Sequence, residues 1–282
     1  MKADCHIHMV LDGVDWKASI ARGIQDGYIH KILADYQAKG YTYLRDGGDR
    51  WGVGSRARQL AEQYSITYRT PLAPLCLQGH YGSFIGLTYD TPREYVDLVV
   101  RQKAAGADFV KIMVSGLMDF DRFGVLTEPG LEPTLIAELI HIAHEEGMAV
   151  MAHCNGARTA QTAALAGVDS IEHGAYLDED ALLAMKENKV VWVPTLSTIG
   201  NLQGKGRFRE DAVKQILGSA LENIAFYREI GGLLAPGTDA GAWAVPHGCR
   251  TEEDWLKLAG VGEAELTQGV QTIIRKFKTD RG

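Results

Sequence analysis

The sequence alternates between two kinds of segment along its whole length, and this alternation limits the folds that the chain can adopt. Short apolar runs of strand-like composition are followed by a polar or glycine-rich corner and then by a longer stretch with helical periodicity. In the segment 134–146, Leu135, Leu139 and Ala143 belong to one apolar stripe. The predicted strands are residues 3–9, 41–45, 66–77, 108–114, 147–153, 168–173, 190–195 and 232–239, and further helices are predicted at 91–105, 157–166, 178–188 and 211–230.

Eight strand–helix units in 282 residues predict a parallel sheet, because each strand reaches the next through a right-handed helical crossover. A closed (β/α)8 barrel, the TIM barrel fold, holds eight such units in one α/β domain. An open doubly wound sheet is the alternative, but no G-x-G-x-x-G motif follows the first strand. We find no linker, low-complexity segment or second domain, and therefore expect a single barrel domain over residues 1–282.

Composition narrows the partners and the compartment. The chain is 46% hydrophobic and 23% charged, as is usual for a soluble globular protein, and its net charge of −7 argues against a nucleic-acid surface. The four cysteines are scattered and form no C-x-x-C pair, which fits a reducing compartment. No signal peptide and no apolar run of about 18 residues is present. We therefore expect a cytoplasmic protein that acts on a small molecule and binds neither nucleic acid nor a membrane.

The first predicted strand contains two histidines separated by one residue, in the stretch ADCHIHM at residues 3–9. Because successive side chains of a strand point to opposite faces, His6 and His8 are expected on one face, with Cys5 and Ile7 on the other. Two imidazoles that face the same way form half of a typical metal site. A surface position on a frayed terminus is the ordinary alternative, so the metal interpretation requires partners elsewhere.

Further polar residues stand at the ends of later predicted strands, where a barrel places its active site. They are Lys111, His153, His173 and Asp239. Each alone has an ordinary interpretation: a hydrogen-bonded core histidine, a lysine that extends to the barrel mouth, or an aspartate that forms a turn. Together with His6 and His8 they predict one convergent site. Glu172 precedes His173 in an alternating strand and is expected to face the outer helices.

At these residues the chain resembles the amidohydrolase superfamily, and within it the metal-dependent hydrolases similar to imidazolonepropionase and Xaa-Pro dipeptidases. DCHIH resembles the superfamily's first-strand H-x-H, GYTYLRDGG its second-strand G-x-T-x-x-R-D-x-G, and FVKIMVSG its fourth-strand lysine segment. The most specific stretch runs from AHEEGMAVMAHCNG through SIEHGAY to VPTLS, with both later histidines in the family's order. PGTDAG provides the eighth-strand aspartate.

The resemblance implies a hydrolase with a binuclear metal centre. The implied ligands are His6, His8 and Asp239 for one ion, His153 and His173 for the other, and N-carboxylated Lys111 as the bridge between them. Imidazole and carboxylate donors suit Zn²⁺, although other divalent metals tolerate much of this set. Two metals would generate hydroxide at neutral pH, and Asp239 would act as general acid and base. The expected reaction is hydrolysis of an amide (C–N) bond in a small substrate such as a dipeptide or an N-acyl amino acid.

The chain departs from the family pattern at its ends. The family surrounds its barrel with a β-sandwich built from residues before the first strand and from a C-terminal segment, whereas here the first predicted strand begins at residue 3. We therefore expect no separate β-sandwich domain. We also hypothesise that a second subunit covers the exposed barrel bottom or flanking helices in a homo-oligomer, which gel filtration would detect.

Substrate-binding candidates lie in the predicted loops. His80 follows the third strand. His247 and Trp243 follow Asp239 in the last strand–helix connection, where both are well placed to line a pocket, with loop packing as the ordinary alternative for Trp243. Guanidinium groups suit a substrate carboxylate. The candidates are His80, Tyr81, Arg122, Arg158 and His247, and the sequence does not rank them.

Two alternative functions remain open at this stage. The same hydroxide would attack a lactone or a phosphotriester. From another class, a truncated barrel could bind metal or ligand without turnover. The presence of all the expected ligands favours the enzyme, but substrate specificity lies in loops whose shapes the sequence does not define.

Overall fold

The computed structural model describes residues 2–278, and its strands are short and parallel. One sheet has the order β1-β2-β3 and the other the order β10-β9-β8-β7-β6-β4-β5. The strands are β1 (Lys2–Ile7), β2 (Tyr41–Asp46), β3 (Thr67–Arg69), β4 (Leu75–Leu77), β5 (Leu87–Tyr89), β6 (Val110–Met113), β7 (Val150–Cys154), β8 (Ser170–His173), β9 (Val191–Val193) and β10 (Leu233–Leu234).

Backbone hydrogen bonds join the last strand segment to the first and close the sheet. The amide of Cys5 donates to the carbonyl of Pro236 at 2.9 Å, and the amide of Asp239 donates to the carbonyl of His6 at 2.7 Å. The amide of His8 donates to the carbonyl of Ala240 at 2.7 Å. At the other junction of the two sheets, the amide of Asp108 before β6 donates to the carbonyl of Thr70 after β3 at 2.9 Å. The predicted closed (β/α)8 barrel is confirmed, because these bonds join the two parallel sheets on both sides.

The predicted third strand, residues 66–77, was wrong as one continuous element. It is split into β3, which pairs with β2, and β4, which pairs with β6. The connection contains Pro71 and Pro74, which have no N–H to donate to a ladder. β3 and β4 together occupy one position in the barrel, and β5 is an additional strand beside β4.

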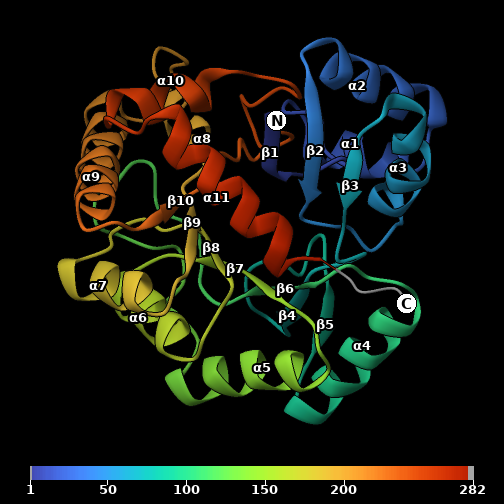
Figure 1. Ribbon diagram of the computed structural model, residues 1–282, viewed down its shortest axis with the longest axis horizontal. Coiled ribbons are helices and arrows are strands. Elements are labelled where there is room, and N and C mark those ends of the chain that lie inside the picture. Colours follow the sequence, from blue (N-terminus) through green and yellow to red (C-terminus); the bar gives the residue numbers. More distant parts are fainter. Residues whose placement is uncertain (1, 279–282) are drawn as a thin grey trace.

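Helices surround the strands (Figure 1). The five predicted helices, α4, α5, α6, α7 and α9, begin and end within one residue of their predicted bounds. Helix α4 starts with a capping box between Thr91 and Glu94, and α5 is followed by Gly147 at φ 70°. The helices are α1 (Trp16–Arg22), α2 (Asp26–Ala38), α3 (Val53–Ala61), α4 (Pro92–Ala104), α5 (Pro133–Glu145), α6 (Ala157–Leu165), α7 (Glu179–Glu187), α8 (Ser197–Gly200), α9 (Glu210–Glu229), α10 (Thr251–Leu258) and α11 (Glu263–Lys276), with a short 3₁₀ helix at Glu62–Tyr64.

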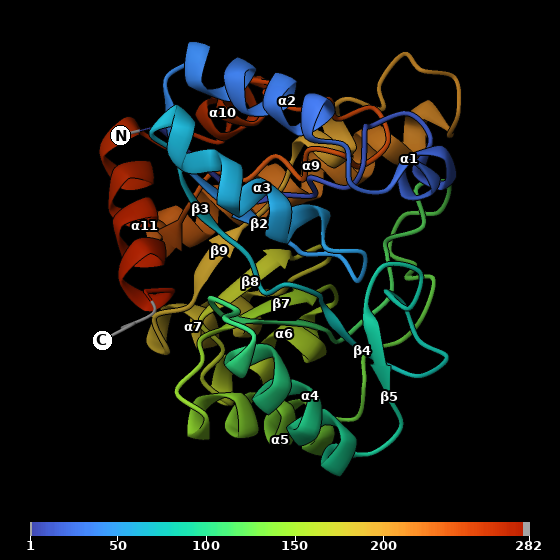
Figure 2. The same cartoon turned by 90° about the vertical axis from the view of Figure 1, so that its right-hand side faces the viewer.

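Helix α11 crosses one end of the barrel, opposite the end that carries α1 and the β4–β5 connection (Figure 2). Phe277, just after α11, packs on Phe109 with ring centroids 5.2 Å apart. Both belong to a buried cluster with Tyr43, Met151 and Cys5 that fills this end of the interior. Cys5 was expected on the opposite face from His6, but a register shift of β1 between Asp4 and Ile7 interrupts the alternation.

Helix α11 and Phe277 thus cover this end of the barrel, and the expected homo-oligomer stays a prediction. Among residues 2–278, no helix combines the length and the apolar composition that a membrane crossing requires.

Candidate metal centre and active site

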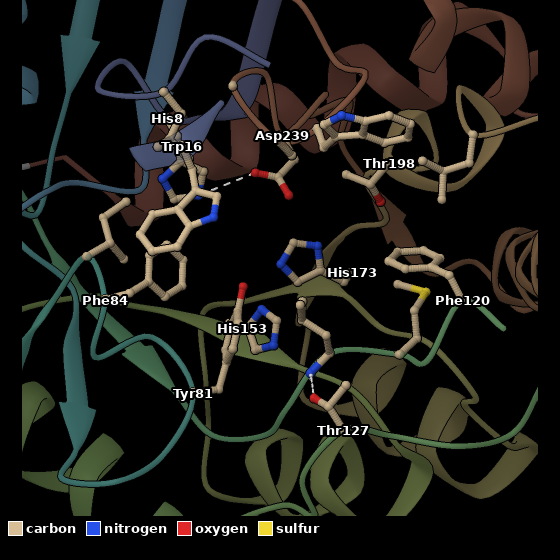
Figure 3. A pocket seen from close by; sticks show the side chains of 18 of the residues that line it. His8, Trp16, Tyr81, Phe84, Phe120, Thr127, His153, His173, Thr198 and Asp239 are labelled. Carbon is tan, nitrogen blue, oxygen red and sulfur yellow. Dashed lines mark hydrogen bonds and ion pairs between the residues drawn. The ribbon is translucent and has the colours of Figure 1, made fainter. Parts of the chain in front are cut away.

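A cavity of about 1000 Å³ opens at the carboxyl ends of the strands. Its lining includes all six side chains that the strand-end pattern selects. Four of them, His8, His153, His173 and Asp239, are labelled in Figure 3. They are His6 and His8 from β1 and its end, Lys111 from β6, His153 from β7, His173 from β8, and Asp239 after β10. Residues separated by more than 200 positions are thus brought to one place, because the parallel strands of a closed barrel all end at the same rim.

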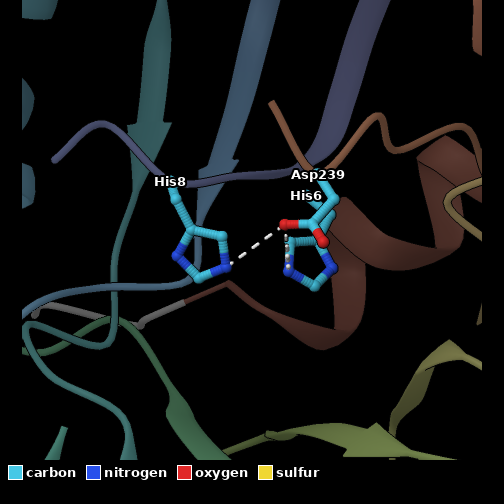
Figure 4. Close-up of side chains that lie close together, drawn as sticks. All are labelled: His6, His8 and Asp239. Carbon is cyan, nitrogen blue, oxygen red and sulfur yellow. Dashed lines mark ion pairs between the residues drawn. The ribbon is translucent and has the colours of Figure 1, made fainter. Parts of the chain in front are cut away.

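His6, His8 and Asp239 form the tightest group (Figure 4). Oδ1 of Asp239 lies 3.3 Å from Nε2 of His8 and 3.6 Å from Nε2 of His6. One donor atom from each residue lies within 4.8 Å of the others, a spacing that one metal ion can bridge. Asp239 adopts φ 56°, a left-handed conformation that is strained for a non-glycine residue and typical of functional sites.

The ring of His6 is anchored from the interior of the barrel. Its Nδ1 donates to Oε2 of Glu172 at 2.8 Å, and this bond leaves Nε2 as the nitrogen that faces the cavity. Nε2 is buried and has no hydrogen-bond partner among the described residues. A buried imidazole nitrogen without a partner, held in the correct tautomer by a carboxylate, is the arrangement expected of a metal ligand.

The prediction that Glu172 faces the outer helices was wrong. Glu172 is buried in the barrel interior, where it also accepts hydrogen bonds from Arg45 at 2.8 Å and from Ser170 at 2.6 Å. Alternation requires extended backbone at consecutive residues, but His173 has φ 68°. Glu172 shares the inward face with Ser170, two residues earlier, and the left-handed backbone at His173 brings the next side chain to the cavity as well.

His153 and His173 form a second pair, with ring centroids 4.6 Å apart. Nε2 of His153 donates to the carbonyl of Gly116 at 3.1 Å, and Nδ1 of His173 lies 2.7 Å from Oγ1 of Thr195. Each ring therefore has one anchored nitrogen and one nitrogen available to the cavity. Burial lowers the pKa of His153 to about 3 and holds the pKa of His173 well below its ordinary value, so both rings stay neutral, as metal ligation requires.

Lys111 projects into the same cavity from β6. Its Nζ is buried and has no hydrogen-bond partner among residues 2–278. Burial lowers the pKa of Lys111 to about 8, and burial raises the pKa of Asp239. An unpaired buried amine is costly and rare, and it indicates that another group satisfies it in the functional protein.

Tyr81 is the one member of the predicted substrate-binding set that lines the cavity, and its ring lies 4.6 Å from that of His153. The other four members are absent from the lining. His80 lies 3.6 Å from Glu128, and Arg158 is exposed at the start of α6.

Two of those four are engaged elsewhere. Arg122 pairs with Asp119, with Nε 2.7 Å from Oδ2. His247 lies with Nε2 2.9 Å from the carbonyl of Leu11, to which it donates. The structure therefore directs these side chains to loop packing, which their sequence positions did not distinguish from substrate contact.

A sequence model of the amidohydrolase family matches residues 40–206, more than half of the chain. The chain belongs to the amidohydrolase family. Among curated proteins, this family member is 28% identical over 275 residues to the ochratoxinase of Aspergillus niger, in an alignment that covers 92% of the chain and 55% of the ochratoxinase. An uncharacterized protein of Mycobacterium tuberculosis is 32% identical over 129 residues, which are 44% of this chain and 34% of that protein. The chain thus spans about half of the ochratoxinase and about a third of the mycobacterial protein.

Solved structures share the fold of this amidohydrolase-family chain. A Xaa-Pro dipeptidase crystallised with bound methionine superposes with a TM-score of 0.79 at 22% identity, over 98% of this chain and 74% of that one. The crystal structure of the A. niger ochratoxinase gives a TM-score of 0.74 at 19% identity, over 98% and 71% of the two chains. At these identities the likeness confirms the barrel fold.

The cavity of this family member also contains residues that the sequence pattern did not reveal. Trp16 and Phe84 lie on one side of the histidines and Phe120 on the other (Figure 3). Phe208 and Arg207 lie on the side that contains Phe120, next to Trp243, which its position after Asp239 in the sequence had suggested as a pocket residue. All of them come from connections or short helices beyond the strand ends, and no periodic pattern marks such positions in advance.

Proposed function

We propose that this chain is a binuclear metal-dependent hydrolase that cleaves an amide (C–N) bond of a small substrate such as a dipeptide or an N-acyl amino acid. The observation that carries the proposal is the convergence of four neutral imidazoles, Asp239 and the unpaired Lys111 in one cavity. Family membership supports it, as do the names of two similar proteins, an ochratoxinase and a Xaa-Pro dipeptidase.

The donor set fits two divalent ions. His6, His8 and Asp239 would hold one ion, and the free ring nitrogens of His153 and His173 the other. A protonated Lys111 would repel both ions, whereas the neutral amine favoured by its lowered pKa reacts with CO₂ to give a carbamate with two oxygen donors. We therefore assign N-carboxylated Lys111 as the bridge, and Zn²⁺ as the ion that this mixture of imidazole and carboxylate suits best.

The metal ions, when bound, would acidify water to a pKa of about 7 and polarise the scissile carbonyl. Asp239 faces the cavity beside His8 and takes the proton of the attacking water. As the C–N bond breaks, Asp239 passes this proton to the leaving nitrogen, so that an acid and an amine are released. Tyr81, packed on His153, borders the space in which the carbonyl would lie.

Two measurements test the proposal. Elemental analysis after purification without chelators should find close to two metal ions per chain, and a library of dipeptides and N-acyl amino acids, with zinc and bicarbonate added, should contain a hydrolysed member. Asp239→Asn should reduce kcat by at least about 100-fold, and Lys111→Ala should abolish both metal bridging and turnover. Asp180→Asn makes the same change on the exposed face of α7. As the matched control, it should have the metal content and the kcat of the parent.

The outcomes separate the alternatives. Turnover of lactones or phosphotriesters without any amide hydrolysis would favour an esterase that uses the same residues. Bound metal without turnover of any substrate class would favour a binding protein. Absence of metal in the protein purified without chelators, or full activity of Asp239→Asn, would refute the assigned roles.

A further inference from the structure

The cavity has one cationic side chain besides Lys111, and it lies at the rim rather than in the metal cluster. Arg207 belongs to the exposed connection between α8 and α9. Its Cζ lies 4.4 Å from the ring centroid of Trp243 and 5.3 Å from that of Phe208. Stacking on aromatic faces holds a guanidinium group flat and leaves its N–H edges free to bind a planar anion.

Arg207 has no carboxylate partner within the part of the chain that the structure describes, since it forms none of the ion pairs found there. The rim carboxylates are, in contrast, already engaged. Oδ2 of Asp119 accepts from Nε of Arg122 at 2.7 Å, and Oδ1 of Asp15 accepts from the amides of Lys17 and Ala18 at the start of α1. The uncommitted charge at the cavity rim is therefore positive.

The wall beneath Arg207 is aromatic. The ring centroid of Phe208 lies 5.1 Å from that of Phe120 and 6.3 Å from that of Trp243. The cavity of about 1000 Å³ is at the upper end of the range for drug-sized ligands and exceeds the needs of a small dipeptide. A ligand that fills it presents a ring or a large apolar group to this wall.

We propose that Arg207 binds the free carboxylate of the substrate, and that the preferred substrates are N-acyl amino acids whose apolar side chain or acyl group packs on the wall of Phe120, Phe208 and Trp243. This inference rests on the proposed hydrolase function and assigns the substrate class and the residue that selects it. Arg207 thus binds the substrate carboxylate, the role for which the sequence could not choose among Arg122, Arg158 and the other candidates.

The first test measures binding without turnover. N-(p-toluenesulfonyl)-phenylalanine and its carboxamide form a matched pair of ligands that differ in one negative charge and have a sulfonamide in place of the scissile N-acyl amide. Their Kd values are read from the change in tryptophan fluorescence, for the parent protein, Arg207→Met, Arg207→Lys and the control Lys205→Met. Lys205 carries the same charge in the same exposed connection but does not line the cavity.

We expect the parent and Lys205→Met to bind the acid about 10- to 100-fold more tightly than the amide, the range typical of a charge-assisted hydrogen-bonded pair. Arg207→Met should lose this preference for the acid and bind the amide as the parent does. Arg207→Lys should retain part of the preference, because lysine keeps the positive charge but lacks the paired N–H groups that bind both carboxylate oxygens. Equal preference for the acid in Arg207→Met and in the parent would overturn the proposal.

The second test compares hydrolysis of N-benzoyl-phenylalanine and its carboxamide by the same variants. Arg207→Met should raise KM for the acid about 10-fold or more with little change in kcat. In this proposal Arg207 contacts the carboxylate and not the reacting bond, so it stabilises the bound substrate and the transition state equally. Loss of acid preference in the binding assay without hydrolysis of either compound would support Arg207 and contradict the hydrolase proposal. Hydrolysis of both compounds with no preference for the acid would support the hydrolase proposal and contradict the role of Arg207.

Discussion

Oε2 of Glu172 lies 2.8 Å from Nδ1 of His6, although the two residues are 166 positions apart in the chain and belong to strands that are not neighbours in the barrel. Oε1 of the same carboxylate accepts from Nη2 of Arg45 at 2.8 Å, and the Arg45 guanidinium stacks 4.5 Å from the ring centroid of Phe277. A continuous buried path therefore connects the end covered by α11 with His6, a proposed metal ligand. Its function is to fix the direction of the His6 ring.

Replacement of Glu172 by Gln should weaken metal binding by about 10- to 100-fold, the usual cost of losing the carboxylate behind a ligating histidine. The amide keeps the shape of the side chain but removes the charge that makes the His6 imidazole a better donor. Competition with a chromophoric chelator measures the affinity. Glu179→Gln, on the exposed face of α7, should leave it unchanged. An unaltered metal affinity in Glu172→Gln would show that Glu172 does not position His6.

Replacement of Arg45 by Met should lower the free energy of unfolding by about 3–5 kcal/mol, because it leaves the Glu172 carboxylate buried without its countercharge. Urea denaturation of the metal-free protein measures this loss separately from any effect on metal binding. Arg101→Met removes an exposed arginine from α4 and should change stability by less than about 0.5 kcal/mol. A loss below about 1 kcal/mol for Arg45→Met would mean that Glu172 is stabilised in another way.

Glu252 should make stability depend on pH. Its buried carboxylate accepts from the amides of Leu196 at 3.0 Å and Ser197 at 2.7 Å, and burial raises its pKa from 4.5 to about 8. The native state then binds the proton more tightly than the unfolded state, so this contribution to stability is complete below about pH 4.5 and is lost as the pH rises through 8.

Glu252→Gln removes this titration. At pH 5 the variant should be about 1 kcal/mol less stable than the parent, since the amide cannot accept both N–H groups, and the difference should shrink or reverse by pH 9. Urea denaturation across this pH range measures it. Asp254→Asn removes an exposed carboxylate from the same helix, and its free energy of unfolding should vary with pH as that of the parent does. A constant difference between Glu252→Gln and the parent at all pH values would contradict the raised pKa.

Two glycine-to-alanine changes should have opposite effects. Gly218 lies within α9 with open space around the position of an added Cβ, so Gly218→Ala should stabilise the protein by about 0.5–1 kcal/mol. Gly269 lies in α11 against β10, where an added Cβ would overlap the carbonyl oxygen of Leu234. Gly269→Ala should therefore destabilise by about 1–3 kcal/mol, and thermal denaturation compares the two. Equal effects would mean that α11 is not held tightly on the barrel end.

The strand-end residues were predictable because each could be recognised from the few residues next to it in the sequence. Lys111, His153 and His173 each stand at the carboxyl end of an apolar run, and a parallel barrel brings such ends to one rim whatever the details of packing. The position of Glu172 was not predictable in this way. The sequence interpretation assigned the inward face to His173 by alternation, whereas Glu172 shares that face with Ser170, and the left-handed backbone of His173 turns the histidine inward as well.

Local periodicity was thus sufficient to predict the strand–helix alternation and the order of the polar strand ends, and the motifs at those ends carried the resemblance to the amidohydrolase superfamily. Which loop residues line the cavity could be determined only from the tertiary structure. Arg207, Phe120 and Trp243 come from separate connections, and no short-range pattern relates them, because loop conformation is set by long-range packing rather than by the side-chain alternation of a strand or the turn of a helix. For the same reason Arg122, which carries the same charge and also follows a strand end, pairs with Asp119 and does not line the cavity.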